Sequence, residues 1–394
     1  MITMPRPTFF EFFAGGGMAR AGLGLEWECL FANDFDRMKV DTYIANWGAE
    51  HVLCEDVAKV SSSQLSGIPD LVWASFPCQD LSLAGDYRGL GNAASPVLTR
   101  SGTFWPFWSI VKALKKERRS PRMIVLENVC GAITSRGGKD FAAICAAISG
   151  LDYMFGAIVI DAIRFVPQSR QRVFFVAVES GFAIDQQLFS NSHSVEWHPR
   201  ALVEAHKLLT PTAKRKWLWW NPPIPPRRNG NLADLIERMP SGVEWHKAQV
   251  TRDLLKMMTP LNRTKVTAAQ ASGERAIGCL YKRTRADKNG VKRQRAEVRF
   301  DDVAGCLRTP GGGSSRQSIL IVDGKEVRSR LLSAREAARL MGLPDSYKIP
   351  ARYNDAYHVA GDGVCVPVVT YLSKSLLEPL LASINSPIPL MAAC

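Results

Sequence analysis

The sequence predicts an α/β fold in which a doubly wound, mainly parallel sheet is joined to a second, smaller, irregular β-rich domain. Three observations lead to this prediction. Short apolar runs alternate with helix-like segments from residue 8 to residue 178, as in successive βαβ units. The alternation stops between residues 185 and 325, where proline, tryptophan and cationic residues accumulate. An apolar amphipathic segment then closes the chain.

Length and charge set the outer bounds. A chain of 394 residues is long for one hydrophobic core, so we expect domains at 1–184 and 185–350 and a segment, 351–394, that returns to the first domain. The formal net charge is +13. Such an excess favours an anionic polymer as partner, nucleic acid before membrane, although solubility alone also accounts for it.

The nine cysteines include no Cys-x-x-Cys pair. This usage favours a reduced, cytoplasmic protein over a disulfide framework, and it predicts no metal site. The first residues lack the apolar stretch of a signal peptide, and no run suggests a membrane span.

The first strand, residues 8–13, runs directly into a glycine turn that contains Gly15 and Gly17, and a helix is expected from Met18. A strand, a glycine turn and a helix start form a place where the backbone can approach a nucleotide-like ligand closely. Phe13 lies at the strand end of this turn.

The second strand ends in Asn33-Asp34-Phe35-Asp36. Asp34 there could accept hydrogen bonds from ribose hydroxyls, and Phe35 could stack on adenine. The alternative is that Asp34 or Asp36 caps the next helix. A further acid, Asp56, follows the short strand 52–54.

The fourth candidate strand, Leu71-Val72-Trp73, leads into Ala74-Ser75-Phe76-Pro77-Cys78-Gln79. A tight proline turn presents Cys78 at the carboxyl edge of the sheet, where open α/β sheets keep their chemistry. Its thiolate could act as a nucleophile. The alternative is a packed core cysteine.

Two more strands carry charged residues at their ends. Glu127 directly follows the strand 122–126, at the same edge as Cys78. Gln168, Arg170 and Arg172 recur with period two before the strand 173–178, so we expect them on one face. The alternative for these arginines is a solvated strand edge.

The region after residue 185 contains an extended, proline-rich segment, 217–228, and then a dense run of cations. Asn289-Gly290 predicts a hairpin tip, with cations on both arms: Lys282, Arg283, Arg285, Lys288, Lys292, Arg293, Arg295 and Arg299. Such a hairpin can follow phosphates or read a groove; the alternative is a solvated loop. A helix over 333–342 is marked by Ser333 as cap, Glu336 and Gly342.

Together these features fit methyl transfer to C5 of cytosine. This carbon is a weak nucleophile until a thiolate adds to C6; an acid at N3 and a guanidinium at O2 then stabilise the developing charge. S-adenosylmethionine would supply the methyl group, with its adenosine held by the glycine turn, Asp34 and Phe35. In duplex DNA the base must first be flipped out.

The chain resembles the bacterial DNA (cytosine-5)-methyltransferases of the restriction-modification and orphan type. The resemblance covers nearly the whole chain and rests on motifs in family order: Phe13-Ala-Gly15-Gly-Gly17, Asn33-Asp34-Phe35-Asp36, Glu55-Asp56-Val57, Phe76-Pro77-Cys78-Gln79, Glu127-Asn128-Val129, Gln168-Ser-Arg170-Gln-Arg172 and Arg335-Glu336-Ala-Ala-Arg339-Leu-Met-Gly342. It implies that the domain 185–350 is the target-recognition domain.

The resemblance implies roles for single residues. Cys78 is the expected nucleophile, Glu127 the N3 partner and Arg172 the O2 partner, with Arg170 in a positional role. The expected S-adenosylmethionine residues are Phe13, Gly15, Gly17, Asp34, Phe35, Asp56, Val57, Pro77, Asp362 and Val364. The expected DNA contacts are Gln79, Ser82, Arg88, Gln168, Arg283, Arg285, Arg293 and Arg295.

The same resemblance implies double-stranded DNA as substrate, S-adenosyl-L-homocysteine as product, a monomer, a bacterial or phage origin, and a restriction endonuclease that would act separately. Glu11, Met18, Cys306 and the pair Asp362-Gly363 depart from the family pattern, which usually has Asp, Gly, Thr and Asn-Ser there. A tRNA cytosine-5-methyltransferase and a catalytically silent DNA-binding relative are the alternatives.

Overall fold

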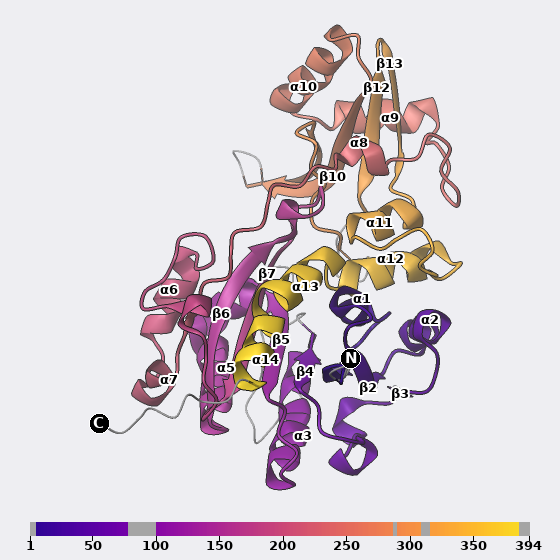
Figure 1. The fold of residues 1–394 in the computed structure, drawn as a ribbon. Coiled ribbons are helices and arrows are strands. Elements are labelled where there is room, and N and C mark those ends of the chain that lie inside the picture. The colour runs from indigo at the N-terminus through magenta and orange to yellow at the C-terminus, as the bar shows by residue number, and fades with distance from the viewer. Residues whose placement is uncertain (1–4, 78–99, 287–289, 309–315, 386–394) are drawn as a thin grey trace. The chain divides into compact units, whose positions relative to one another are not determined.

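The computed structural model describes residues 5–77, 100–286, 290–308 and 316–385. The chain divides into two compact units (Figure 1). The first unit contains residues 1–161, 171–225 and 364–394, and the second contains 162–170 and 226–363. The expected boundaries at 184/185 and 350/351 are therefore wrong: the chain passes between the units at other points, twice around a short segment, 162–170.

The first unit is built on a seven-stranded sheet with the order β3-β2-β1-β4-β5-β7-β6. Strands β1 to β5 are parallel, whereas β7 runs antiparallel to both β5 and β6. The bounds are β1 Thr8–Phe12, β2 Glu28–Asp34, β3 Val52–Cys54, β4 Leu71–Ala74, β5 Met123–Val129, β6 Tyr153–Asp161 and β7 Gln171–Glu179. The predicted doubly wound, mainly parallel sheet is confirmed.

Helices cover this sheet, because its central strands are apolar on both faces. Phe10 and Val72 pack with helix α3 in one large core, while their neighbours Phe9 and Trp73 are buried on the opposite side. The helices of this unit are α1 Met18–Leu23, α2 Arg37–Trp47, α3 Phe104–Lys116, α4 Gly131–Thr134, α5 Lys139–Gly150, α6 Arg200–Lys207, α7 Pro211–Arg215, α13 Val366–Leu372 and α14 Glu378–Asn385.

Residues 185–225 belong to this first unit, contrary to the expectation that they open the second domain. Their short strands β8 (Phe189–Ser190) and β9 (Trp219–Trp220) pair with each other. Trp217 packs its ring against Phe141 and Phe155, with centroids 6.0 and 5.4 Å apart. Burial of this large aromatic surface in the first core explains the placement.

The end of the chain returns to the first unit, as expected. A Cβ on Gly22 of α1 would lie 2.4 Å from Cβ of Val369 in α13, so only glycine permits this approach. The Thr370 hydroxyl donates to the Gly22 carbonyl (2.8 Å), and the Trp27 indole donates to Ser373 (3.0 Å).

One helical stretch in the described part of the chain, Tyr353–Asn385, has the length and apolar composition of a membrane span. The sequence analysis expected none. In the apolar 18-residue part of this stretch, 61% is buried within the protein, as in core helices.

The second unit contains a four-stranded antiparallel sheet with the order β11-β10-β12-β13. Its strands are β10 Ala276–Ala286, β11 Lys292–Arg299, β12 Ser318–Asp323 and β13 Glu326–Leu331, and its helices are α8 Leu232–Leu235, α9 Ala248–Lys256, α10 Pro260–Ala271, α11 Ala334–Leu340 and α12 Tyr353–Asp362. A small core of Leu280, Val298 and Leu320 with Leu254 and Val266 joins α9 and α10 to the sheet. The predicted helix α11 and its Ser333–Glu336 capping box are confirmed.

Candidate active site

The glycine turn after β1 is tied to the end of β2. The Gly15 backbone N–H donates to Asp34 Oδ2 at 2.8 Å. Gly15 and Gly17 have φ angles of 56° and 83°, a region that L side chains rarely adopt. A Cβ on Gly17 would lie 2.5 Å from the indole nitrogen of Trp47. The turn therefore requires glycine at both positions.

Asp34 and Asp36 have separate tasks. Asp36 caps α2 by accepting from the Met38 backbone N–H at 3.0 Å, as the alternative interpretation allowed. Asp34 is buried and also accepts from the Asp36 N–H at 2.9 Å. Burial raises the pKa of the Asp34 carboxyl. Between them Phe35 leaves 70% of its surface exposed, so its ring is open to a planar partner.

Glu11 in β1 is the group that the sequence analysis noted only as a departure. It is buried, and its Oε2 has no hydrogen-bond partner within the described residues. Burial raises its pKa to about 8, against the lowering effect of the nearby Arg20. Because a pKa of about 8 leaves this carboxyl mostly protonated at neutral pH, the unpartnered oxygen could donate as well as accept a hydrogen bond.

Of the other predicted cofactor residues, Phe13 directly follows β1, and Asp56 and Val57 follow β3, at the carboxyl ends of these parallel strands. Phe13 adopts a positive φ of 58° and packs its ring against Phe107. Asp56 is exposed and caps a short 3-10 turn by accepting from the Ala58 N–H, whereas Val57 is buried in the core. Val364 is buried in the first unit, and Asp362, in the second unit, ends α12.

The chain that leads to Cys78 is held on two sides. The Asn128 side chain in β5 donates to the Phe76 carbonyl at 3.0 Å, and the Ser75 N–H donates to the Phe12 carbonyl at 3.4 Å. The Phe76 ring packs on Phe104. Cys78, Gln79, Ser82 and Arg88 lie outside the described residues. Sequence reasoning missed Asn128 as a support for this turn, although it follows Glu127 directly.

Glu127 and Arg172 meet at the ends of β5 and β7. The Arg172 Nε lies 3.1 Å from Glu127 Oε1, and the two side chains are only 14% and 8% exposed. The antiparallel register pairs Val129 with Arg172, which brings the two side chains together. The structure thus joins the acid and the guanidinium that the sequence analysis selected separately.

Arg170 and Gln168 belong to the second unit and do not share a strand face with Arg172. The Arg170 guanidinium is buried and donates to the carbonyls of Leu307, Gly361 and Gly363 at 3.1, 2.8 and 2.7 Å. It is a positioning residue that holds the loop at 307 and the turn around Asp362.

The structure contradicts the expected DNA contact of Gln168. Its side chain is fully buried, donates to the Leu340 carbonyl at 2.7 Å and accepts from the Leu307 N–H at 3.1 Å. Both groups of the amide are used inside the unit, so Gln168 has a structural role.

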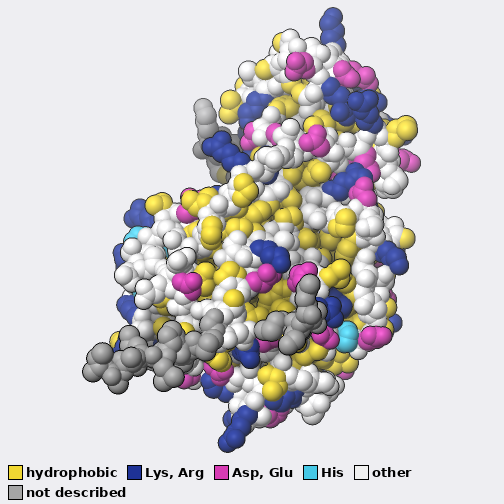
Figure 2. Space-filling view, in the orientation of Figure 1, with side chains coloured by type: hydrophobic (Ala, Val, Ile, Leu, Met, Phe, Trp, Pro, Cys, Tyr) yellow, Lys and Arg dark blue, Asp and Glu magenta, His cyan; other side chains and the backbone are white. Residues whose placement is uncertain are grey.

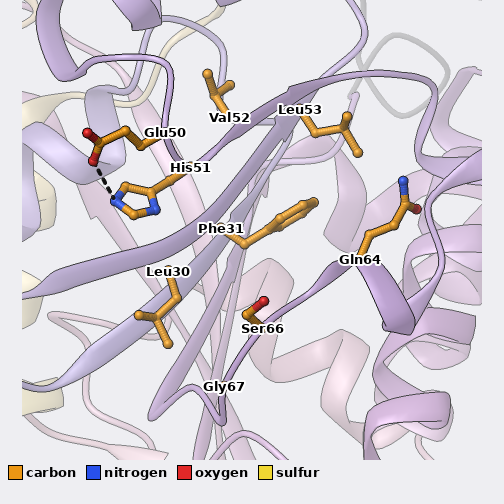
Figure 3. Close-up of a pocket in the computed structure, with 9 residues that line it drawn as sticks. All are labelled: Leu30, Phe31, Glu50, His51, Val52, Leu53, Gln64, Ser66 and Gly67. Atoms are coloured by element: carbon orange, nitrogen blue, oxygen red, sulfur yellow. Dashed lines mark ion pairs between the residues drawn. The ribbon is translucent and has the colours of Figure 1, made fainter.

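A hollow of about 480 Å³ lies at the other end of the first strands (Figure 3). It opens where β2 extends past β3, and a Glu50–His51 ion pair of 3.8 Å lies at its rim. Its lining residues are Leu30, Phe31, Glu50, His51, Val52, Leu53, Gln64, Ser66 and Gly67. None of the predicted cofactor residues is among them, so this hollow is separate from the site described above.

The predicted basic hairpin is confirmed as β10 and β11, which pair over Cys279–Ala286 and Lys292–Arg299. In Figure 2, dark blue Lys and Arg side chains lie along this hairpin, at the upper left of the view. In the described ranges no group of three or more His, Cys, Asp or Glu side chains could hold a metal ion.

Two curated relatives are similar to this chain over most of its length. A DNA-cytosine methyltransferase of Escherichia coli (strain K12) is 27% identical over 94% of this chain and 77% of its own length. The type II methyltransferase M.HhaI of Haemophilus parahaemolyticus is 24% identical over 93% of each chain.

Two solved structures share the fold. The S. pombe Dnmt2 methyltransferase superposes with a TM-score of 0.58 at 18% identity over 95% of this chain and 99% of its own. The Entamoeba histolytica methyltransferase EhMeth does so with a TM-score of 0.55 at 13% identity over 97% and 100%. The family described as C-5 cytosine-specific DNA methylase matches residues 7–378, and the chain therefore belongs to this family.

Proposed function

We propose that this DNA cytosine-5 methyltransferase uses S-adenosylmethionine to methylate a cytosine flipped out of duplex DNA, through a covalent bond between Cys78 and C6 of the base. The observation that carries the proposal is the buried Glu127–Arg172 pair at the carboxyl edge of the sheet. Asn128, next to Glu127, holds the carbonyl of Phe76, two residues before Cys78.

The residues at the glycine turn suit the cofactor. The turn can approach a ligand without side-chain hindrance, Phe35 offers an open aromatic face, and Asp34 places a buried carboxyl between them. Glu11 adds a buried carboxyl oxygen without a partner in the described chain. We expect Gly15, Gly17, Asp34 and Phe35 to hold the adenosine. We expect the glycine turn to face the rest of the S-adenosylmethionine molecule. When bound, S-adenosylmethionine supplies the methyl group.

Three groups of the protein then act on the base. The Cys78 thiolate adds to C6 and makes C5 nucleophilic, while Glu127 hydrogen-bonds at N3 and Arg172 at O2 as charge develops. C5 forms its bond to the methyl carbon as the bond from that carbon to sulfur breaks, with S-adenosylhomocysteine as the leaving group. Loss of the C5 proton to a base then expels the thiolate, which restores the aromatic ring and the free enzyme.

The test is a duplex library that carries 5-fluorocytosine, from which the C5 substituent cannot leave as a proton. With the methyl donor present, we expect a covalent adduct whose peptide maps to Cys78. Methyl transfer to tRNA in place of duplex DNA would favour the tRNA alternative. DNA binding without any adduct or transfer would favour the catalytically silent relative.

Glu127→Gln should lower the rate of methyl transfer by about a hundredfold. The glutamine amide can still hydrogen-bond to N3 of the base, but it lacks the carboxyl group that stabilises the charge developing there. Affinity for S-adenosylmethionine should change little. Single-turnover kinetics measure the first quantity and calorimetric titration the second.

Glu179→Gln is the matched control for this change. Glu179 ends the same strand β7 as Arg172 but pairs with Lys115 at 3.4 Å. Its variant should retain the wild-type rate. Loss of cofactor binding in Glu127→Gln, with an unchanged rate at saturation, would show that Glu127 has been placed in the wrong role.

A further inference from the structure

Arginines of the β10–β11 hairpin face one another in cross-strand pairs. The register sets Arg283 opposite Arg295 and Arg285 opposite Arg293. Because side chains alternate along a strand, these four positions share one face with Tyr281 and Glu297. The opposite face carries the pairs Lys282 with Ala296, Thr284 with Gln294 and Ala286 with Lys292.

This arrangement is costly for the isolated protein, since like charges directly opposite each other destabilise a strand pair. One partial compensation is Glu297, whose Oε2 lies 3.4 Å from the Arg283 Nε. The Arg283 side chain is still 49% exposed. Half-exposed as it is, Arg283 offers its guanidinium to an anionic or electron-rich partner.

The part of the β10–β11 hairpin that carries these arginines extends beyond the rest of its sheet. Strand β12 pairs with β10 only over Ala276–Leu280, so among the described strands the part of β10 from Tyr281 onward pairs with β11 alone. A two-stranded ribbon of this kind has the width that a DNA major groove admits.

Building on the proposed function, we propose that the arginine face of this ribbon enters the major groove and reads guanines of the target sequence. Arginine binds O6 and N7 of guanine through two parallel hydrogen bonds. Successive rows on one face of a strand are about 6.8 Å apart, which matches about two base-pair steps of 3.4 Å. The row of Arg283 and Arg295 and the next row, which contains Arg293, can therefore address base pairs two steps apart.

Selection of bound duplexes from a random library tests this without relying on catalysis. Arg295→Ala should lower the preference for guanine at one or more positions by about tenfold or more. Arg295→Lys keeps the charge but loses the planar fork, so it should lose the preference while keeping the salt dependence of binding. This second variant also guards against misfolding of the hairpin in the first.

Lys282→Ala and Lys292→Ala, on the opposite face, are the matched controls and should select the wild-type sequence. The proposal is overturned if Arg295→Lys selects the wild-type sequence, if the lysine variants alone change it, or if the protein selects RNA over duplex DNA. A protein that selects guanine-containing duplexes through Arg295 but transfers no methyl group would contradict the proposed reaction and support the proposal made for the ribbon.

Discussion

Cys78→Ser should lower methyl transfer by about a thousandfold or more and leave the affinity for duplex DNA nearly unchanged. A thiol with a pKa of about 8.5 provides thiolate near neutral pH, whereas a serine hydroxyl provides almost no alkoxide without a dedicated base. The proposed role of Glu127 and Arg172 is to stabilise the base after attack, so neither replaces the missing nucleophile. Transfer from labelled S-adenosylmethionine and filter binding measure the two quantities.

Cys54→Ser is the matched control for this change. Cys54 ends β3 and donates weakly to the Phe35 carbonyl at 3.8 Å, a contact that a hydroxyl also makes. This variant should transfer methyl groups and form the 5-fluorocytosine adduct like the wild type. Normal methylation by Cys78→Ser would remove the covalent step from the mechanism.

The elements that the sequence predicted well are those whose signals are local. The apolar run Leu71–Trp73, the glycine turn after β1 and the capping box of Ser333 each act through neighbours in the chain. Asn289, which was expected at a hairpin tip, lies outside the described residues. Local propensity and turn chemistry decide such features, so sequence reasoning reaches them.

Features decided by distant contacts were missed. Alternation of strands and helices carries no sign of direction, and so it could not reveal that β7 runs antiparallel between β5 and β6. The loss of alternation after residue 185 suggested a new domain, yet burial of Trp217 against Phe141 and Phe155 keeps this segment in the first unit.

The candidate site shows the same division. Glu127 and Arg172 were each selected from strand ends, but only the antiparallel register of β5 and β7 brings them to 3.1 Å. The period-two spacing predicted that Gln168, Arg170 and Arg172 lie on one face of a strand, and this prediction is wrong. The strand begins only at Gln171, and hydrogen bonds to Leu307 and Leu340 draw Gln168 into the second unit.

Arg330→Met should weaken the second unit by about 3–5 kcal/mol, because it leaves a buried carboxylate without its cation. Arg330 in β13 and Glu336 in α11 are both fully buried and form a bidentate pair with distances of 2.7 and 2.6 Å. Glu336 also accepts from the backbone N–H groups of Ser333 and Glu237, so the pair joins three segments. Hydrogen exchange of peptides from β12 and β13 measures the opening free energy of this unit alone.

Two further variants separate the charge from the packing. Adding Glu336→Gln to Arg330→Met removes the uncompensated charge while the amide oxygen can still accept from the backbone, so the double variant should be more stable than Arg330→Met. Lys256→Met breaks an exposed pair with Asp253 at 3.8 Å in the same unit and should cost less than about 1 kcal/mol. If the second unit opened no more readily in Arg330→Met than in Lys256→Met, the buried pair would contribute little to the stability of this unit. Apolar contacts would then account for the packing of α11 on the sheet.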